Sequence, residues 1–182
     1  MPAATESVKV LIVTNHHENH TGNDAQFVAA GIRTIAQENA ARRFRAPATE
    51  GEKASTPTIE VYDREYTLRQ GGVEVQLRSF GRARTDGDTV VYFPDLKVVV
   101  VGDLFNGGMP EPDFSAGGSL VDWGPVLARV LELDFDVVVP GDLGWRSASG
   151  ARRSTAFTRS YPRRSNAAGR LRPGRPVRLK PS

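Results

Sequence analysis

The chain has 182 residues, which is enough for one domain with a buried core, and it has no cysteine, which excludes disulfides and thiolate metal sites. All 21 acidic residues but only 13 of the 24 lysines and arginines lie in residues 1–142, which carry a net charge of −8, whereas residues 143–182 carry +11. No apolar stretch approaches a membrane span and no signal peptide is evident, so we expect a cytoplasmic protein unless N-terminal truncation has removed an export signal.

Residues 1–142 have the pattern of an α/β (α+β) domain. The apolar run Val8–Val13 predicts a buried strand, and the alternation in Val73–Phe80 predicts a strand with one wet face. The other expected elements are a helix over Asp24–Ala30, a strand over Thr34–Ala36, a helix over Gln37–Phe44, strands over Ile59–Tyr62, Glu65–Arg69, Thr89–Phe93 and Lys97–Val101, a helix over Ser119–Leu133 and a strand over Asp136–Val139. This order indicates two packed sheets with helices outside them.

All three histidines of the chain lie within five positions, in the segment directly after the first strand. The carboxyl ends of strands are where α/β sheets usually place their sites, and histidine is the commonest metal ligand. His17 and His20 are three positions apart, so a tight loop can turn both imidazoles toward one point. We expect the side chains of His16 and Glu18 to point away from the point that His17 and His20 share. The alternative is that all three histidines are solvated and have no role.

The segment Thr14–Gly22 resembles the signature T-H-x-H-x-D-H-x-G of the metallo-β-lactamase superfamily. Thr14, His17, His20 and Gly22 match the signature. Asn15 stands at the position of the first histidine, and Asn19 stands at the position of the aspartate. The match to this segment alone is therefore partial.

Three later segments resemble that family in the same order, namely Phe80–Tyr92, Val98–Phe105 and Val137–Asp142. In the first of them Arg84 takes the place of a metal-binding histidine. Asp103, in the second, is similar to the family's aspartate that bridges two metal ions. In the third, Asp142 takes the place of the last histidine.

The resemblance covers residues 8–142 and implies the αββα sandwich of that family. The family has several strands of its first sheet before the signature, and only Val8–Val13 precedes it here, so we expect N-terminal strands to be missing. We take 1–142 as a partial metallo-β-lactamase-like domain and 143–182 as a basic, disordered tail.

The resemblance also implies a metal site, which the substitutions reduce. The first ion would have Asn15, His17 and Arg84, and a guanidinium cannot bind a metal ion and repels it. We therefore expect that position to be empty, with the head group of Arg84 in the place of the metal.

The second ion would have His20, Asp103 and Asp142, with Asn19 beside them, and His17 could swing in. The implied ligands are thus His17, His20, Asp103 and Asp142, with Asp103 also the implied catalytic residue. They predict at most one ion, Zn²⁺ or alternatively Mn²⁺ or Fe²⁺. A simpler interpretation is that Asp103 only ends its strand and pairs with Arg84.

The sequence therefore predicts a metal-dependent hydrolase for a small-molecule substrate, such as a β-lactam, a thioester or a related ester, with a reduced or inactive metal site. One alternative is a non-catalytic binding module with the same fold. Another is a nucleic-acid-binding protein that uses its basic tail through counterion release. The tail has no interleaved aromatic residues, and a shifted reading frame explains its Arg, Ala, Gly, Pro and Ser content more simply than a specific reader does.

Removal of residues 143–182 is expected to leave the thermal unfolding of the remaining chain nearly unchanged, because the tail offers no apolar face to bury. The measurement is a thermal melt of the full chain and of the truncated chain, followed by circular dichroism. Loss of cooperative unfolding on truncation would show that the tail packs against the domain.

Overall fold

The structure is a computed structural model, which describes residues 8–22, 26–27, 30–43, 59–106 and 109–141. Asp142 and the basic tail lie outside the described residues, as does most of the helix expected over Asp24–Ala30, of which Gln26 and Phe27 are helical. Every other expected helix and strand is present within two residues of its predicted ends. Where the structure describes the chain, no helix has the length and apolarity needed to cross a membrane.

The first sheet has three parallel strands, β1 (Val10–Val13), β2 (Arg33–Gln37) and β3 (Ile59–Tyr62), in the order β1-β2-β3. The short helix α1 (Glu18–Thr21) follows β1, and α3 (Glu38–Arg43) follows β2 directly. The parallel direction requires these crossovers, because only antiparallel strands can be joined by a tight turn.

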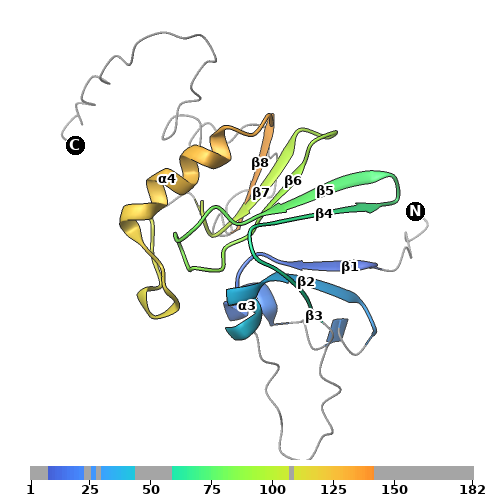
Figure 1. Cartoon of the computed structure of the whole chain (residues 1–182), viewed down its shortest axis with the longest axis horizontal. Helices are drawn as coiled ribbons and strands as arrows, with labels where there is room; N and C mark the ends of the chain where they lie inside the picture. The colour runs from blue at the N-terminus through green and yellow to red at the C-terminus, as the bar shows by residue number, and fades with distance from the viewer. Residues whose placement is uncertain (1–7, 23–25, 28–29, 44–58, 107–108, 142–182) are drawn as a thin grey trace, which may run out of the picture.

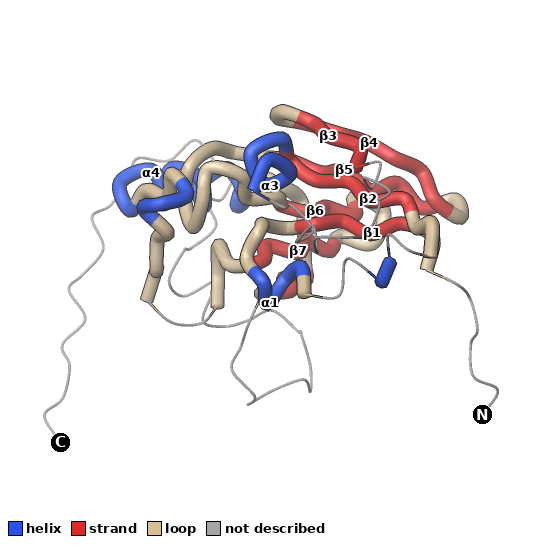
Figure 2. The backbone as a smooth tube through the Cα atoms, turned by 90° about the horizontal axis from the view of Figure 1, so that it is seen from below, coloured by secondary structure: helices blue, strands red, loops and turns tan. Residues whose placement is uncertain are grey.

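The second sheet has five strands in sequence order, β4 (Glu65–Gln70), β5 (Val73–Arg78), β6 (Val90–Phe93), β7 (Val98–Gly102) and β8 (Val137–Pro140). The first four strands form an antiparallel meander, and β8 pairs with β7 in parallel. The crossover between β7 and β8 holds the 3-10 turn η1 (Phe114–Ala116) and the helix α4 (Leu120–Leu131). Figure 1 shows the two sheets with α4 on the side of β7 and β8, and in Figure 2 the labelled helices lie toward one side of the strands.

Two hydrophobic clusters make the core, one on each face of the five-stranded sheet. The cluster between the two sheets contains Ile35, Tyr62, Leu68, Val75, Leu77 and Val91. The cluster on the opposite face joins β6, β7 and β8 to α4 through residues that include Val99, Val101, Trp123, Leu127 and Val138. The predicted α/β fold, with two packed sheets, is therefore confirmed, and α4 forms a layer outside the larger sheet.

Polar contacts also join the two sheets. The Tyr62 hydroxyl on β3 lies 2.6 Å from the Thr89 hydroxyl just before β6, and both residues are buried. The Tyr66 hydroxyl on β4 donates to the Glu60 carboxylate on β3 at 2.7 Å. The Tyr62–Thr89 bond fixes the alignment of the sheets at their shared boundary, since a shift of either sheet would leave these two buried hydroxyls without partners.

Replacement of Leu77 by alanine is expected to lower the free energy of unfolding by about 2–5 kcal/mol, because the side chain is fully buried between the sheets and its loss leaves a cavity. Leu96→Ala is the matched control. Its side chain is 58% exposed, so the expected change is within about 0.5 kcal/mol. Urea unfolding at equilibrium measures both, and equal losses in the two variants would contradict the packing described for Leu77.

Candidate metal centre

The candidate site lies where β1 and β7 end. Thr14 and Asn15 follow β1, and Asp103 follows β7. The two strand ends approach closely because Gly102 adopts a left-handed φ of 52° and has no side chain, and a Cβ there would lie 3.1 Å from the Cβ of Thr14. Gly141, after β8, has even less room, since its Cβ would lie 2.6 Å from the carbonyl carbon of Gly102. The backbone thus brings the histidine segment against Asp103.

Asp103 is the centre of the polar contacts. His20 Nε2 lies 2.9 Å from its Oδ1, and Asn15 Nδ2 donates to its Oδ2 at 3.0 Å. Arg84 Nε and His17 Nδ1 lie 3.7 and 3.8 Å from Oδ2. Burial raises the pKa of Asp103, but the hydrogen bonds from His20 and Asn15 and the charge of Arg84 outweigh burial and bring the pKa below its usual value. The carboxylate is therefore held in its charged form.

The two asparagines that replace expected site residues have different environments. Asn15 is 1% exposed, donates to Asp103, and accepts a hydrogen bond from the backbone N–H of His17 at 3.0 Å. Its amide therefore positions the histidine segment. Asn19 is exposed on α1, away from the buried contacts.

Arg84 reaches into the site, as expected. Its Nε faces Asp103, and its Nη1 donates to the backbone carbonyl of Glu111. The pairing of Asp103 with Arg84, which the sequence left as a simpler interpretation, is thus present, but together with the contacts to His20 and Asn15. The donor set Asn15, His17 and Arg84 does not fit the family's first metal ion, because one of its three members is a cation.

His17 has a carboxylate on each side of its ring. Its Nδ1 faces Asp103, and its Nε2 lies 3.0 Å from Oδ2 of Asp113. Asp113 precedes η1 and accepts from the Ser115 hydroxyl and the Ala116 backbone N–H through Oδ1. The hydrogen bonds from Ser115 and His17 hold the pKa of Asp113 below its usual value. The sequence analysis did not predict Asp113 as a site residue. Its only sequence signal is that aspartate is a common helix cap and that it lies in a Gly/Pro-rich loop.

His16, which we expected to point away from the ligand positions, lies next to one of them, His17. The ring centroids of His16 and His17 are 4.6 Å apart, just before α1 begins at Glu18. Burial, with the neighbouring His17 and Arg43, lowers the pKa of His16 below its usual value. His16, His17 and Asp113 each offer a ligand atom, and these atoms lie within 4.8 Å of one another.

The structure thus brings His17, His20 and Asp103 together, while the fourth predicted ligand, Asp142, lies outside the described residues. We call His17, His20 and Asp103 the Asp103 group, and His16, His17 and Asp113 the Asp113 group. His17 belongs to both.

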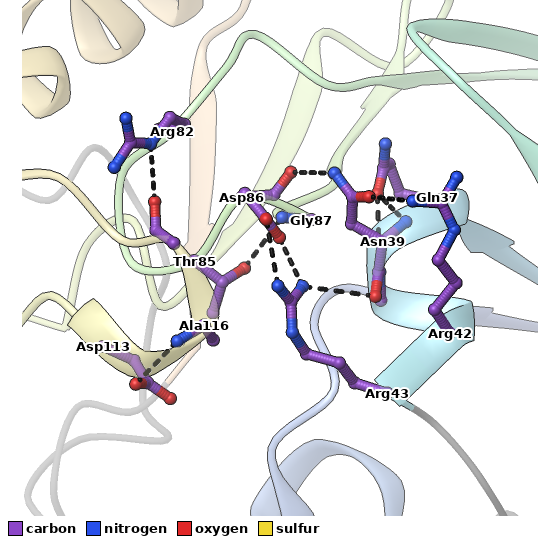
Figure 3. Close-up of polar contacts among 12 residues, drawn as sticks. Gln37, Asn39, Arg42, Arg43, Arg82, Thr85, Asp86, Gly87, Asp113 and Ala116 are labelled. Carbon is purple, nitrogen blue, oxygen red and sulfur yellow. Dashed lines mark hydrogen bonds and ion pairs between the residues drawn. The ribbon is translucent and has the colours of Figure 1, made fainter.

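The side chains of Thr85 and Asp86 and the backbone of Arg84 hold the loop that carries Arg84. Thr85 donates to the buried Asp88 through its backbone N–H and its hydroxyl, at 2.9 and 2.8 Å. Asp86 pairs with Arg43 of α3, whose Nη2 donates at 3.0 Å, and the backbone carbonyl of Asp86 accepts from the Asn39 side chain, as Figure 3 shows. Further along the chain, the Asp113 backbone N–H donates to the Arg84 carbonyl at 2.7 Å. The loops that carry Arg84 and Asp113 are therefore fixed to each other.

Comparison with known proteins agrees with this geometry. The sequence model of the metallo-beta-lactamase superfamily matches residues 5–142. The 2,4-dinitroanisole O-demethylase subunit alpha of Nocardioides sp. (strain JS1661) is 30% identical over 142 residues, which are 76% of this chain but only 41% of that protein.

Solved structures give the same fold. The metallo-beta-lactamase from Pontibacter korlensis is 22% identical, with a TM-score of 0.59 over 72% of this chain and 60% of that one. The metallo-beta-lactamase IND-7 is 19% identical, with a TM-score of 0.59 over 78% of this chain and 64% of that one.

The chain belongs to the metallo-β-lactamase superfamily. Members of this superfamily bind metal ions, and the described residues hold a His-His-Asp group that could take one. The chain spans less than two thirds of the length of these relatives.

Replacement of Asn15 by aspartate is expected to destabilise the metal-free protein by about 1–3 kcal/mol near pH 8, because the Asp103 carboxylate loses a donor and gains a like charge. Burial and Asp103 should raise the pKa of the new carboxyl in the folded state, so the destabilisation grows as the pH rises above about 4 and disappears below it. Asn19→Asp is the matched control, since it adds the same charge at an exposed position. Urea unfolding with chelator at pH 5 and pH 8 measures the difference. Equal losses in the two variants at pH 8 would show that Asn15 does not support Asp103.

Proposed function

We propose that this chain is a metal-dependent hydrolase of the metallo-β-lactamase superfamily that uses one divalent ion, bound through His17. The observation that carries the proposal is the environment of this residue. His17 lies between two carboxylates, and among the described residues its Nδ1 and that of the adjacent His16 are the buried side-chain atoms without a hydrogen-bond partner. Buried polar atoms without partners are rare, and a bound ion is one explanation for them.

A single ion is proposed because Arg84 interferes with a second. Its guanidinium stands beside Asp103. A second ion that shared the Asp103 carboxylate with the first would therefore be repelled by a fixed positive charge. When bound, a divalent ion of this kind supplies Lewis-acid activation of water or of a carbonyl oxygen. The ligand candidates are His17 with either the rest of the Asp103 group or the rest of the Asp113 group, and Zn²⁺, Mn²⁺ and Fe²⁺ all suit imidazole with carboxylate.

The chain's own residues predict weak activity. Asn19 cannot accept a proton near neutral pH, whereas the aspartate that the family has at this position can. Asp103 already accepts from His20 and Asn15, so it is poorly placed to take a proton from water. Substrates to test are β-lactams, thioesters and related esters. The relative from Nocardioides, named for 2,4-dinitroanisole, adds activated aryl methyl ethers. The pairing of Arg84 with Asp103 favours one alternative, a binding module without catalysis.

Restoring the family's residues through Asn15→His, Asn19→Asp and Arg84→His, with Asp142→His added, is expected to raise zinc binding and hydrolysis together. The physical reason is that the substitutions remove a cation and supply imidazole and carboxylate ligands. Elemental analysis of the purified proteins and turnover of a β-lactam and a thioester provide the measurements. The unchanged chain should hold at most one ion and turn over slowly.

Two results would contradict this proposal. Two ions per unchanged chain would show that Arg84 does not block a site. The second result is that the chain holds no ion at saturating Zn²⁺ and Mn²⁺ and that a chelator does not change its residual activity. The chain would then not be a metallohydrolase, and the non-catalytic binding module would be the remaining alternative.

A further inference from the structure

We propose that the single ion binds at the Asp113 group, His16, His17 and Asp113, and not at the position that the family uses beside Asp103. This inference rests on the proposed function, since it specifies where that ion lies. His16 and Asp113 have no counterpart in the family signature, so the site would be one that this chain has built around a retained family histidine.

The spacing of the Asp113 group suits an ion. Adjacent ligands of a six-coordinate ion at about 2.1 Å stand about 3.0 Å apart. His17 Nε2 and Asp113 Oδ2 are already 3.0 Å apart, and all three ligand atoms of the group lie within 4.8 Å of one another. The group therefore needs only small side-chain shifts to surround an ion.

His16 distinguishes the two candidate positions of the ion, the Asp113 group and the Asp103 group. Among the described residues, the buried side-chain nitrogens and oxygens without a hydrogen-bond partner are His16 Nδ1 and His17 Nδ1. An ion at the Asp103 group would leave His16 Nδ1 without a partner, whereas an ion at the Asp113 group can take this atom as a ligand while His17 binds through Nε2 and turns its Nδ1–H toward Asp103. An ion at the Asp113 group lies beside both rings and gives the His16 imidazole a role that nothing else in the described structure gives it.

Asp113 is prepared as a ligand. Its Oδ1 is occupied by the Ser115 hydroxyl and the Ala116 backbone N–H, which leaves Oδ2 directed at His17 (Figure 3 shows the bond to Ala116). The backbone of Asp113 is also held, because its N–H donates to the Arg84 carbonyl at 2.7 Å and its carbonyl accepts from the Gly118 N–H at 2.7 Å. The packing around Asp113 thus fixes one oxygen beside the two rings.

By comparison, the carboxylate oxygens of the Asp103 group are already engaged. Both oxygens of Asp103 already accept hydrogen bonds, one from Asn15 and the other in contact with His20, and Arg84 adds a positive charge 3.7 Å away. An ion there would have to displace these contacts. With the ion on His17 Nε2, the Nδ1–H of His17 instead faces Asp103, and a carboxylate behind a metal-bound histidine is a common arrangement that orients the ring.

Two imidazoles and one carboxylate with the remaining positions open suit Zn²⁺, Mn²⁺ or Fe²⁺. The test uses the full chain and measures the dissociation constants of Zn²⁺ and Mn²⁺ by isothermal titration calorimetry. His16→Ala and Asp113→Asn are each expected to weaken binding at least ten-fold. His20→Ala should change it less than three-fold. Glu111→Gln is the matched control, since it removes a negative charge from the same loop at an exposed side chain and should leave affinity nearly unchanged.

The tautomer of His17 gives a second measurement that survives any loss of stability in the variants. In the unchanged chain with Zn²⁺ bound, long-range ¹⁵N–¹H spectra should show Nε2 bound to the ion and Nδ1 protonated.

The outcomes separate this inference from the proposed function. If His20→Ala removes binding while His16→Ala does not, or if the ion is on Nδ1 of His17, the ion lies at the family position; the inference fails and the proposed function stands. If the unchanged chain binds no ion, both fail.

Discussion

The buried charge of Asp103 is the constraint on which the site depends. A carboxylate that is largely removed from water must be matched by hydrogen-bond donors or positive charge, because an unpaired buried charge is strongly unfavourable. Here the partners come from separate parts of the chain, Asn15 and His20 after β1 and Arg84 from the loop before β6. Because these segments join the two sheets, the compensation of a single charge also holds the sandwich together at the ends of its strands.

This compensation explains how a metallo-β-lactamase fold can keep its site residues in place when the usual ligand set is incomplete. In a two-ion site the metal ions would neutralise the aspartate. In this chain Arg84 supplies a fixed positive charge and Asn15 supplies a neutral donor, so Asp103 is satisfied by protein groups alone. Within the part of the chain that the structure describes, the buried side-chain atoms without a hydrogen-bond partner are on His16 and His17, not on Asp103.

Much of this arrangement was predictable from the sequence, for identifiable reasons. The strands were predictable because they are short apolar runs such as Val98–Val101. The family resemblance placed Asp103 and Arg84 near the histidines, although these residues are far from the histidines in sequence. The contribution of Asp113 was not predictable, because it lies in an aperiodic loop whose fold depends on backbone contacts with Arg84 and Gly118. The packing of the His16 ring against that of His17 was not predictable either, because it depends on where α1 begins. Such one-residue boundaries are the least certain part of any sequence interpretation.

The support of the Arg84 loop by its other residues has a consequence for how such a protein changes over time. Thr85, Asp86 and Asp88 carry the contacts within this loop and to α3, whereas the side chain at position 84 reaches out of the loop to Asp103 and to the Glu111 carbonyl. An exchange at position 84 therefore alters the charge offered to the site while the backbone path stays the same. The cost of such an exchange in folding is therefore the loss of the positive charge beside Asp103, not the loss of the loop. A lineage with this loop can therefore exchange the residue at position 84 without refolding the backbone around it, provided that another positive charge, such as a metal ion, compensates Asp103.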